Sequence, residues 1–328
     1  MAPLFRVGIV GAGRIAATFD VPAGPEIRTH MKAILSEPRL LITHIGDKDR
    51  QKAFEAAKLF GVNAEIAEPD AVAVADVDAL CIASPDGTHL AYAQRGADGP
   101  ARVVLVEKPL EGTGEVRNAL AARLAARGAT LVLHHQRRWI PGLADWVGQA
   151  RNGAFGAPLS ATVHYTRGFR HNGVHALDLV AAFFGTEIGT VAEIADGIAD
   201  YSKEDLTRSL LVTMRSGTRR VPLTMFGVDG RVQTAFSVTL TFERAKVAVF
   251  DEGSIRAELH RPTEHEIAGF APELRTMVKF DDDPPQLLAA VWRNIADHLE
   301  SGAPIACAGR DALAAYDLAD AVLARCAV

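Results

Sequence analysis

Cysteine is scarce in this chain. Its 328 residues include only three, Cys81, Cys307 and Cys326, which lie far apart and form no CxxC pair. An odd number of isolated cysteines argues against a disulfide framework and against a structural zinc site. We therefore expect a protein of the reducing cytoplasm that folds without covalent cross-links.

The chain also lacks an excess of positive charge and any long apolar run. Its 35 Lys and Arg residues against 40 Asp and Glu give a formal net charge of -5. Little is therefore available to neutralise a phosphate backbone, and we expect no nucleic-acid partner. No window of about 18 residues is apolar throughout, and the first apolar stretch is too short for an export signal. These absences predict a soluble protein with no membrane partner.

The chain is long enough for two domains. Apolar residues make up 48% and charged residues 23%, close to globular averages, so large cores can form. Up to about residue 135, short β-branched runs alternate with Ala-rich stretches, which predicts a parallel sheet covered by helices on both faces. The predicted strands are 5–10, 40–45, 78–83, 102–107 and 130–134, and the clearest helices are 50–60, 88–99 and 113–127.

The second part of the chain has a different pattern. Runs of alternating polarity are separated by turn-forming residues and predict an antiparallel or mixed sheet. These runs are 159–166, 210–214, 221–226, 236–242 and 246–250. Helical spacing at 288–299 and 311–326 predicts two closing helices. We therefore divide the chain into an α/β domain at 1–135 and an α+β domain at 136–328, whose last helices can pack back on the first domain.

The first motif that carries chemistry is Gly11-Ala12-Gly13-Arg14-Ile15-Ala16, between a predicted strand and a helical stretch. Its two glycines allow a tight turn and let backbone amides approach a pyrophosphate at the positive end of the following helix. A turn with a purely structural role is the alternative, but the position of the motif favours a dinucleotide. We predict that Gly11, Gly13, Arg14 and Ile15 contact the cofactor.

An acidic residue, Asp47, follows the second predicted strand. A carboxylate there can accept hydrogen bonds from the adenosine ribose and would repel a 2′-phosphate, so Asp47 favours NAD over NADP. The interval from Gly11 exceeds the usual interval of about twenty residues, which we attribute to an insertion at residues 20–26. Lys48 and Arg50 could tolerate a phosphate, so NADP and a plain solvated charge cluster both remain open.

Two more predicted strands end in polar turns. Ser84 and Pro85 precede a helix start at His89, a pattern that by itself also fits a generic turn with a capping histidine. Glu107 and Lys108 stand before a proline at the carboxyl end of the next strand, the edge where ligands gather in open α/β sheets. A lysine at this edge can hydrogen-bond to a substrate hydroxyl or a nicotinamide ribose and take part in acid/base chemistry.

A histidine-rich segment lies early in the second part of the chain. His171 and His175 are four residues apart and Asp178 follows three later, so in a helix they share one face. A zinc site is one alternative, although neither an HExxH pattern nor a cysteine accompanies them. Histidines that cap a helix are another. We favour acid/base chemistry beside a bound cofactor, because histidine exchanges protons near neutral pH, and we expect no metal.

Taken together and in this order, the motifs resemble the Gfo/Idh/MocA family of glucose-fructose oxidoreductase, inositol dehydrogenase and MocA-like proteins. The resemblance covers nearly the whole chain, and Glu107-Lys108-Pro109 is its most specific element. Its other elements are Gly11 to Ala16, Ser84-Pro85 with His89, Gln136 to Pro141, Gly173 with His175 and Asp178, and the closing helices after Pro284.

The resemblance implies a fold and a reaction class. An N-terminal Rossmann domain with a doubly wound parallel sheet would be followed by a C-terminal domain with a large, mostly antiparallel open sheet flanked by helices. That sheet often forms the oligomer face, so we expect a homodimer or homotetramer. The implied reaction is oxidoreduction of a sugar or polyol with NAD or NADP.

The resemblance also implies a catalytic set of Lys108, His175 and His171. Lys108 would hold and polarise the reacting hydroxyl or carbonyl, and His175 would exchange its proton while hydride moves to or from the nicotinamide. Many members carry an aspartate at the position of His171, so this departure changes the proton path, favours an anionic substrate or removes activity. The expected cofactor contacts further include Ser84, Pro85, His89 and Glu107, and the expected substrate contacts are Arg138, Trp139, Tyr165, Arg167 and Asn172.

The leading hypothesis is therefore an NAD-dependent dehydrogenase or reductase whose partner is a small carbohydrate substrate. A sensor or regulatory protein that binds the cofactor without turnover is the main alternative, because a fold does not fix a function. A third hypothesis is a hydrolase or lyase in which the cofactor is recycled.

Overall fold

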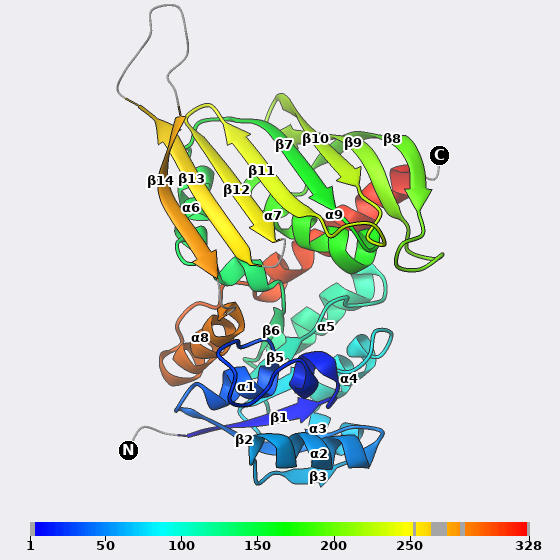
Figure 1. Cartoon of the computed structure of the whole chain (residues 1–328), viewed down its shortest axis with the longest axis vertical. Helices are drawn as coiled ribbons and strands as arrows, with labels where there is room; N and C mark the ends of the chain where they lie inside the picture. The colour runs from blue at the N-terminus through cyan, green and yellow to red at the C-terminus, as the bar shows by residue number, and fades with distance from the viewer. Residues whose placement is uncertain (1–3, 252–253, 264–273, 283–285, 327–328) are drawn as a thin grey trace, which may run out of the picture. The chain divides into compact units, whose positions relative to one another are not determined.

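The computed structural model describes residues 4–251, 254–263, 274–282 and 286–326. The chain divides into two compact units (Figure 1). The first comprises Met1–Trp139 with Pro284–Leu313, and the second comprises Ile140–Asp283 with Ala314–Val328. Within the described residues, the first unit holds a six-stranded sheet and the second an eight-stranded sheet. The predicted fold class, a parallel α/β domain joined to an α+β domain with a mostly antiparallel sheet, is confirmed.

The sheet of the first unit is parallel, with its strands in the order β3-β2-β1-β4-β5-β6. The strands are β1 (Phe5–Val10), β2 (Leu40–Gly46), β3 (Glu65–Ala67), β4 (Ala79–Ile82), β5 (Val103–Val106) and β6 (Thr130–Leu133). Because β1 is flanked by β2 and β4, the strand order reverses there, and ligands of such folds bind beyond the carboxyl ends of the strands at this point.

Burial explains most of these strands. Every residue of β4 and β5 is buried, as expected for apolar strands of a sheet covered on both faces. The five strands predicted for this unit are therefore confirmed to within a residue or two. The edge strand β3 was not predicted, because its Glu-Ile-Ala sequence has neither a β-branched run nor an alternation.

The helices of the first unit begin at recognisable caps. Thr29 accepts the Lys32 N–H at the start of α1, Asp49 caps α2 and Thr113 caps α5. Gly128, with a φ of 74°, follows the end of α5 and allows the chain to turn there. The helical segments are a π-type turn at Arg14–Thr18, α1 (His30–Leu35), α2 (Arg50–Phe60), α3 (Pro69–Ala73), α4 (His89–Gly96), α5 (Gly114–Ala126), a 3-10 turn at Gln136–Trp139 and α8 (Leu287–Ser301).

The sheet of the second unit has the strand order β14-β13-β12-β11-β7-β10-β9-β8, and only its β7–β10 pair is parallel among the described residues. The strands are β7 (Pro158–Tyr165), β8 (Ile188–Ile198), β9 (Thr207–Ser216), β10 (Arg219–Gly227), β11 (Phe236–Phe242), β12 (Ala245–Asp251), β13 (Ile255–Pro262) and β14 (Leu274–Asp282). The five predicted runs correspond to β7, β9, β10, β11 and β12, whereas β8, β13 and β14 were not predicted.

Helices cover one face of this sheet. They are α6 (Leu143–Arg151), α7 (Val174–Phe184) and α9 (Gly309–Cys326), and a π-type turn at Phe169–Gly173 leads into α7 (Figure 1). Burial alternates strictly along β11, and every residue of α7 is buried, so the core of the unit lies between α7 and the sheet. No helix within the described residues has the length and apolar character needed to cross a membrane.

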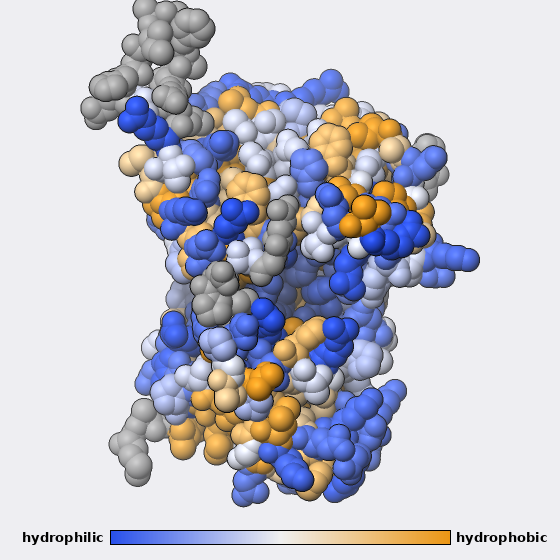
Figure 2. All heavy atoms as spheres, viewed as in Figure 1, coloured by the Kyte–Doolittle hydropathy of each residue, from blue (hydrophilic) through white to orange (hydrophobic). Residues whose placement is uncertain are grey.

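Among the residues that the structure describes, no helix lies on the opposite face of the eight-stranded sheet (Figure 1). Apolar side chains there remain partly exposed, including Ile194 at 48%, Leu211 at 43% and Phe226 at 39%. Figure 2 shows apolar and polar residues intermixed on this face.

Candidate active site

The predicted glycine turn follows β1 directly. Gly11 adopts a φ of 101° and donates its backbone N–H to the Gly46 carbonyl oxygen at 2.7 Å. A Cβ on Gly11 would overlap with the Ala83 carbonyl oxygen, so only glycine fits between the ends of β1 and β4. A Cβ on Gly13 would meet no described atom within 4 Å, so its backbone is accessible to a close-lying ligand.

Two predicted cofactor residues, Arg14 and Ile15, open the helical turn after the glycines. Arg14 is exposed, and its guanidinium carbon lies 4.3 Å from the centroid of the Phe19 ring. Ile15 is half-buried. The turn therefore presents one exposed cation and one apolar side chain next to the accessible backbone of Gly13.

Asp47 lies at the carboxyl end of β2 and is half-buried. One carboxylate oxygen accepts the Ala12 N–H at 2.8 Å, and the other accepts the Asp49 N–H at 2.9 Å. The structure thus joins Asp47 to the glycine turn. Lys48 and Arg50 are exposed beside it.

The turns after β4 and β5 are joined by His89, the first residue of α4. Its Nε2 lies 2.7 Å from the Ser84 carbonyl oxygen, and its Nδ1 lies 2.7 Å from the Pro109 carbonyl oxygen. The Ser84 hydroxyl is 2.8 Å from that of Thr88, and Pro85 is exposed. His89 is buried, so its visible role is to hold two turns at the ligand-binding edge of the sheet together.

Glu107 and Lys108 follow β5 at the same edge. Glu107 is buried and accepts from two imidazoles, His30 Nε2 at 2.8 Å and His134 Nδ1 at 2.6 Å. Burial by itself would raise the pKa of the Glu107 carboxyl, but the charge and hydrogen bond of His134, together with His30, hold that pKa well below its usual value. Lys108 is half-buried, and its backbone N–H points to Glu107 Oε2 at 3.3 Å.

The sequence pattern did not identify His30 and His134 as members of this site. His134 ends a predicted strand at the ligand-binding edge, and that position could have drawn attention to it. His30 carried no such signal, because it follows the insertion that separates the glycine turn from α1.

The predicted catalytic histidines belong to the second unit. His171 lies in the π-type turn, where its ring stacks on Tyr201 with centroids 3.9 Å apart and its backbone N–H donates to Asp205 Oδ2 at 2.8 Å. His175 is the second residue of α7 and is 8% exposed, and Asp178 on the same helix is buried. Because Lys108 belongs to the first unit, the expectation that it faces one substrate with these histidines stays a prediction.

The predicted substrate residues fall in both units. Arg138 and Trp139 are buried in the first unit, where the indole N–H of Trp139 donates to Asn294 Oδ1 at 2.9 Å. In the second unit, Asn172 Nδ2 donates to the Thr166 carbonyl oxygen at 2.9 Å. Trp139 and Asn172 therefore each have a structural partner in their own unit.

Tyr165 is the last residue of β7, and Arg167 lies two residues further along the chain. Tyr165 is fully buried; its hydroxyl donates to the Arg208 carbonyl oxygen and accepts the Arg208 N–H, both at 2.8 Å. Burial raises the pKa of the Tyr165 phenol. Arg167 has an exposed side chain and a φ of 65°, and its backbone N–H donates to Asp200 Oδ2 at 2.7 Å.

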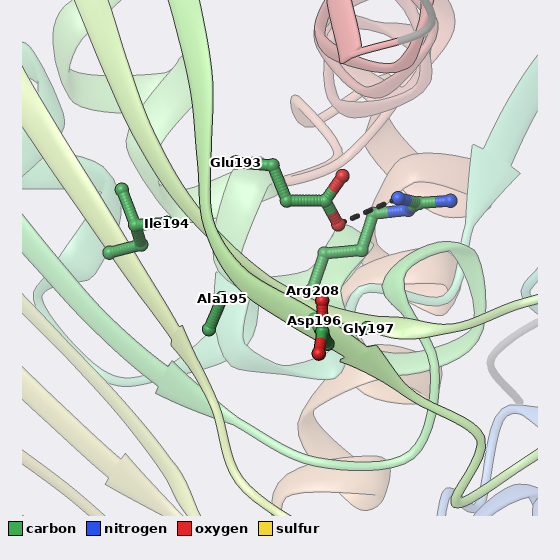
Figure 3. A pocket seen from close by; sticks show the side chains of 6 residues that line it. All are labelled: Glu193, Ile194, Ala195, Asp196, Gly197 and Arg208. Atoms are coloured by element: carbon green, nitrogen blue, oxygen red, sulfur yellow. Dashed lines mark hydrogen bonds and ion pairs between the residues drawn. The ribbon is translucent and has the colours of Figure 1, made fainter.

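A separate pocket lies along β8 in the second unit, lined by Glu193 to Gly197 and Arg208. Figure 3 shows the Glu193 and Arg208 side chains turned toward one another, with Arg208 Nη1 donating to Glu193 Oε1 at 2.7 Å. The two charges compensate each other, and none of the predicted site residues lines this pocket. It is therefore a weaker candidate than the edge of the parallel sheet.

Comparison with known proteins supports the fold described above. Residues 5–135 match the model of an oxidoreductase family with an NAD-binding Rossmann fold. The inositol 2-dehydrogenase of Rhizobium meliloti is 26% identical over 348 residues, covering 97% of this chain and 96% of that protein. The inositol 2-dehydrogenase of Acidothermus cellulolyticus is 27% identical over 281 residues, covering 80% of this chain and 76% of that protein.

A solved structure of UDP-N-acetylglucosamine 3-dehydrogenase from Acidithiobacillus ferrooxidans has the same fold. It superposes with a TM-score of 0.73 at 19% identity, over 98% of this chain and 97% of that one. Residues 5–135 therefore belong to the Gfo/Idh/MocA family of NAD-binding oxidoreductases, and the chain as a whole is similar to inositol 2-dehydrogenases over most of its length.

Proposed function

We propose that this protein is an NAD-dependent dehydrogenase or reductase that acts on a CH–OH group of a cyclitol, sugar or sugar derivative. Its family supports the reaction type, and its inositol dehydrogenase relatives support the substrate class. One observation carries the proposal: the glycine turn, Asp47 and Lys108 all follow the carboxyl ends of strands in one parallel sheet.

The residues at this edge fit a dinucleotide. The tight turn at Gly11 and the accessible backbone at Gly13 suit a pyrophosphate, and the Asp47 carboxylate suits the two hydroxyls of an adenosine ribose. The same carboxylate disfavours a 2′-phosphate, which supports NAD. The exposed Lys48 and Arg50 leave NADP as the alternative cofactor.

When bound, the nicotinamide ring would supply the hydride acceptor or donor. Lys108 would hold the substrate oxygen through its ammonium group, and His175 would take the hydroxyl proton during oxidation or return it during reduction. His171 brings an imidazole where many relatives have a carboxylate. Together with the exposed Arg167 it supports a substrate that carries a carboxylate or phosphate.

The cofactor part of the proposal is tested by titrating the purified chain with NADH and following nicotinamide fluorescence. We expect saturable binding, and no binding at millimolar NADH would contradict it. For turnover, a panel of cyclitols, sugars and sugar acids is screened by NADH absorbance. Lys108→Met should then lower kcat by about a hundredfold or more while the Kd for NADH is unchanged. Lys58→Met, an exposed lysine on α2, is the matched control.

The alternative functions give different outcomes in the same screen. Tight NADH binding without turnover on any substrate would favour a sensor or regulatory protein, for which the replacement at His171 is the supporting observation. Formation of product without a net change in the amount of NADH would favour a hydrolase or lyase that recycles its cofactor.

We also propose that the protein forms a homodimer or homotetramer in the cytoplasm. The helix-free face of the eight-stranded sheet, with Ile194, Leu211 and Phe226 partly exposed, supports a contact between copies. Light scattering on the purified chain measures its mass. Leu211→Lys together with Phe226→Lys should shift it toward the monomer, and a monomeric wild-type chain would contradict the proposal.

A further inference from the structure

A buried cluster of titratable side chains lies next to Lys108 in the first unit. It comprises His30 at the start of α1, Glu107 after β5 and His134 after β6, with side-chain exposures of 0%, 7% and 5%. Their potential ligand atoms lie within 4.8 Å of one another. Burying two imidazoles and a carboxylate removes their polar atoms from water. That cost must be offset either by a bound ion or by hydrogen bonds and protons shared within the cluster.

The geometry favours protons over a metal ion. Nitrogen and oxygen ligands about 2.0–2.1 Å from a tetrahedral zinc ion would be about 3.3 Å apart. The nitrogens of His30 and His134 instead approach Glu107 Oε1 to 2.8 and 2.6 Å, which are hydrogen-bond distances. An ion does not fit between atoms this close.

Trp292 determines where the proton of His30 lies. Its indole Nε1–H can only donate, and it points to His30 Nδ1 at 3.1 Å, so Nδ1 must accept. His30 Nε2 therefore carries the proton and donates it to the ionised Glu107. Burial opposes a second proton on His30, whereas Cys81 and the Glu107 carboxylate favour one and raise the pKa of the ring to about 9. A second proton would have to lie on Nδ1, which faces the indole donor. The hydrogen-bond geometry therefore assigns the neutral Nε2–H tautomer.

His134 completes the arrangement from the other side. Its Nδ1–H donates to the same Glu107 oxygen, whereas its Nε2 has no hydrogen-bond partner among the described residues. Segments α1, β5 and β6 thus meet at one carboxylate, and α8 is joined to them through the contact between Trp292 and His30. The other oxygen of that carboxylate faces the Lys108 backbone N–H at 3.3 Å.

We propose that His30 and Trp292 are positioning residues for Lys108. The hydrogen bonds from Trp292 to His30 and from His30 to Glu107 orient the carboxylate, and the carboxylate in turn fixes the direction in which Lys108 leaves β5. The effect on turnover rests on the proposed function, but the hydrogen-bond pattern can be measured without it.

The pattern is tested by nitrogen NMR of the full-length chain with labelled histidine, in which the His30→Gln variant assigns the His30 signals. We expect wild-type His30 to show a protonated Nε2 and an unprotonated Nδ1. In Trp292→Phe, which removes the indole donor, Nδ1 should gain proton occupancy. Trp146→Phe, an equally buried tryptophan of the second unit, should leave the His30 signals unchanged. A wild-type His30 protonated at Nδ1, or stoichiometric zinc by elemental analysis, would overturn the assignment.

The positioning role is tested by kinetics on a substrate found in the screen. Trp292→Phe and His30→Leu should each lower kcat by about tenfold, the effect of one lost hydrogen bond, with the KM for NAD unchanged. His30→Gln keeps an N–H donor and should stay within about threefold of wild type. Equal losses in the Leu and Gln variants, or wild-type kcat in Trp292→Phe, would overturn the role.

The two proposals fail in different ways. A wild-type chain without turnover on any substrate would remove the proposed function and the kinetic role together, while the tautomer of His30 would still stand or fall by its own spectrum. If the wild-type chain shows turnover but kcat is the same in His30→Leu and His30→Gln, only the positioning role is removed.

Discussion

Asp47 accepts a hydrogen bond from the backbone N–H of Ala12 at 2.8 Å. This bond joins the end of β2 to the glycine turn after β1, the two segments that contact the ribose and the pyrophosphate in dinucleotide-binding folds. The second carboxylate oxygen is held by the Asp49 N–H at 2.9 Å, so the side chain is oriented by the protein itself. Loss of Asp47 should therefore disturb both parts of the cofactor site at once.

We expect Asp47→Ala to weaken NADH binding by about tenfold or more, because it removes an acceptor for the ribose and for Ala12. The same change removes the charge that repels a 2′-phosphate, so the ratio of NADPH to NADH affinity should rise. Fluorescence titration with both nucleotides measures this ratio. Asp49→Ala, which removes the cap of α2, should cost about 1 kcal/mol of stability and leave the ratio unchanged. An unchanged ratio in Asp47→Ala would remove Asp47 from cofactor selection.

The two glycines of the turn should respond differently to alanine. Gly11→Ala forces a side chain into a φ of 101° against the Ala83 carbonyl, so we expect a loss of more than about 2 kcal/mol in the free energy of unfolding. Gly13→Ala meets no described atom and should fold within about 1 kcal/mol of wild type, yet bind NADH more weakly. Denaturant unfolding and NADH titration of both variants separate these effects. Wild-type stability in Gly11→Ala would contradict the role of its backbone angle.

His171→Asp introduces the aspartate that the family resemblance leads us to expect at this position. It exchanges a ring stacked on Tyr201 for a negative charge, and the neighbouring Arg170 is already paired with Asp320 at 2.7 Å. We expect kcat/KM for carboxylated sugars relative to neutral cyclitols to fall by about fivefold, the effect of one exposed charge pair. The measurement is a side-by-side assay on both substrate classes. A ratio that stays constant would separate His171 from substrate charge.

Local patterns were sufficient to predict where two candidate site residues lie in the fold. Asp47 and Lys108 each follow a strand that is visible as an apolar run, and parallel strands bring their carboxyl ends to one edge. The contacts around Glu107 could not be predicted in this way, since His30 is 77 positions from it and Trp292 is 262 positions from His30. Such contacts depend on how α1 and α8 pack, which the spacing within one segment does not encode.

The second unit shows the same limit. Tyr165 ends an alternating run and was expected to contact substrate. Alternation alone, however, does not tell whether a polar side chain at the end of a strand is buried in the protein or exposed to a ligand. The structure buries the ring and uses its hydroxyl to bind the backbone of Arg208. The strand β8 was not predicted because polar and small residues interrupt its apolar pattern, whereas Ile255 to His260 in β13 alternate like the predicted runs and could have been recognised.

Tyr165→Phe tests this structural role. The substitution leaves the Arg208 N–H and carbonyl without their partner in a buried place, so we expect the free energy of unfolding to fall by about 1–2 kcal/mol. Because burial raises the pKa of the phenol, the lost group is neutral and the effect should not change between pH 6 and about pH 9. Tyr92→Phe, a buried tyrosine of the first unit, is the control and should cost less than about 0.5 kcal/mol. Equal losses in the two variants would argue against a special role for the Tyr165 hydroxyl.

Glu107→Gln gives a pH-dependent prediction. His134 and His30 hold the pKa of Glu107 well below its ordinary value of 4.5 in the folded chain, so the unfolded chain binds the proton more readily. The stabilisation by the carboxylate is therefore complete above about pH 4.5 and is lost as the pH falls toward the folded pKa. At pH 7, we expect Glu107→Gln to lower the free energy of unfolding by about 3 kcal/mol or more, because it replaces the charged acceptor of two buried imidazoles by a weaker neutral one and puts an amide NH2 group opposite the Lys108 N–H.

Thermal unfolding of wild type and Glu107→Gln from pH 7 down to about pH 4 measures this dependence. The difference in Tm should stay constant down to about pH 5 and then shrink. Glu55→Gln, an exposed glutamate on α2, should differ little from wild type throughout. A difference between wild type and Glu107→Gln that widens in acid would mean that Glu107 is protonated in the folded chain. In that case His30 could not donate to an ionised carboxylate, and the assignment of its proton to Nε2 would be overturned.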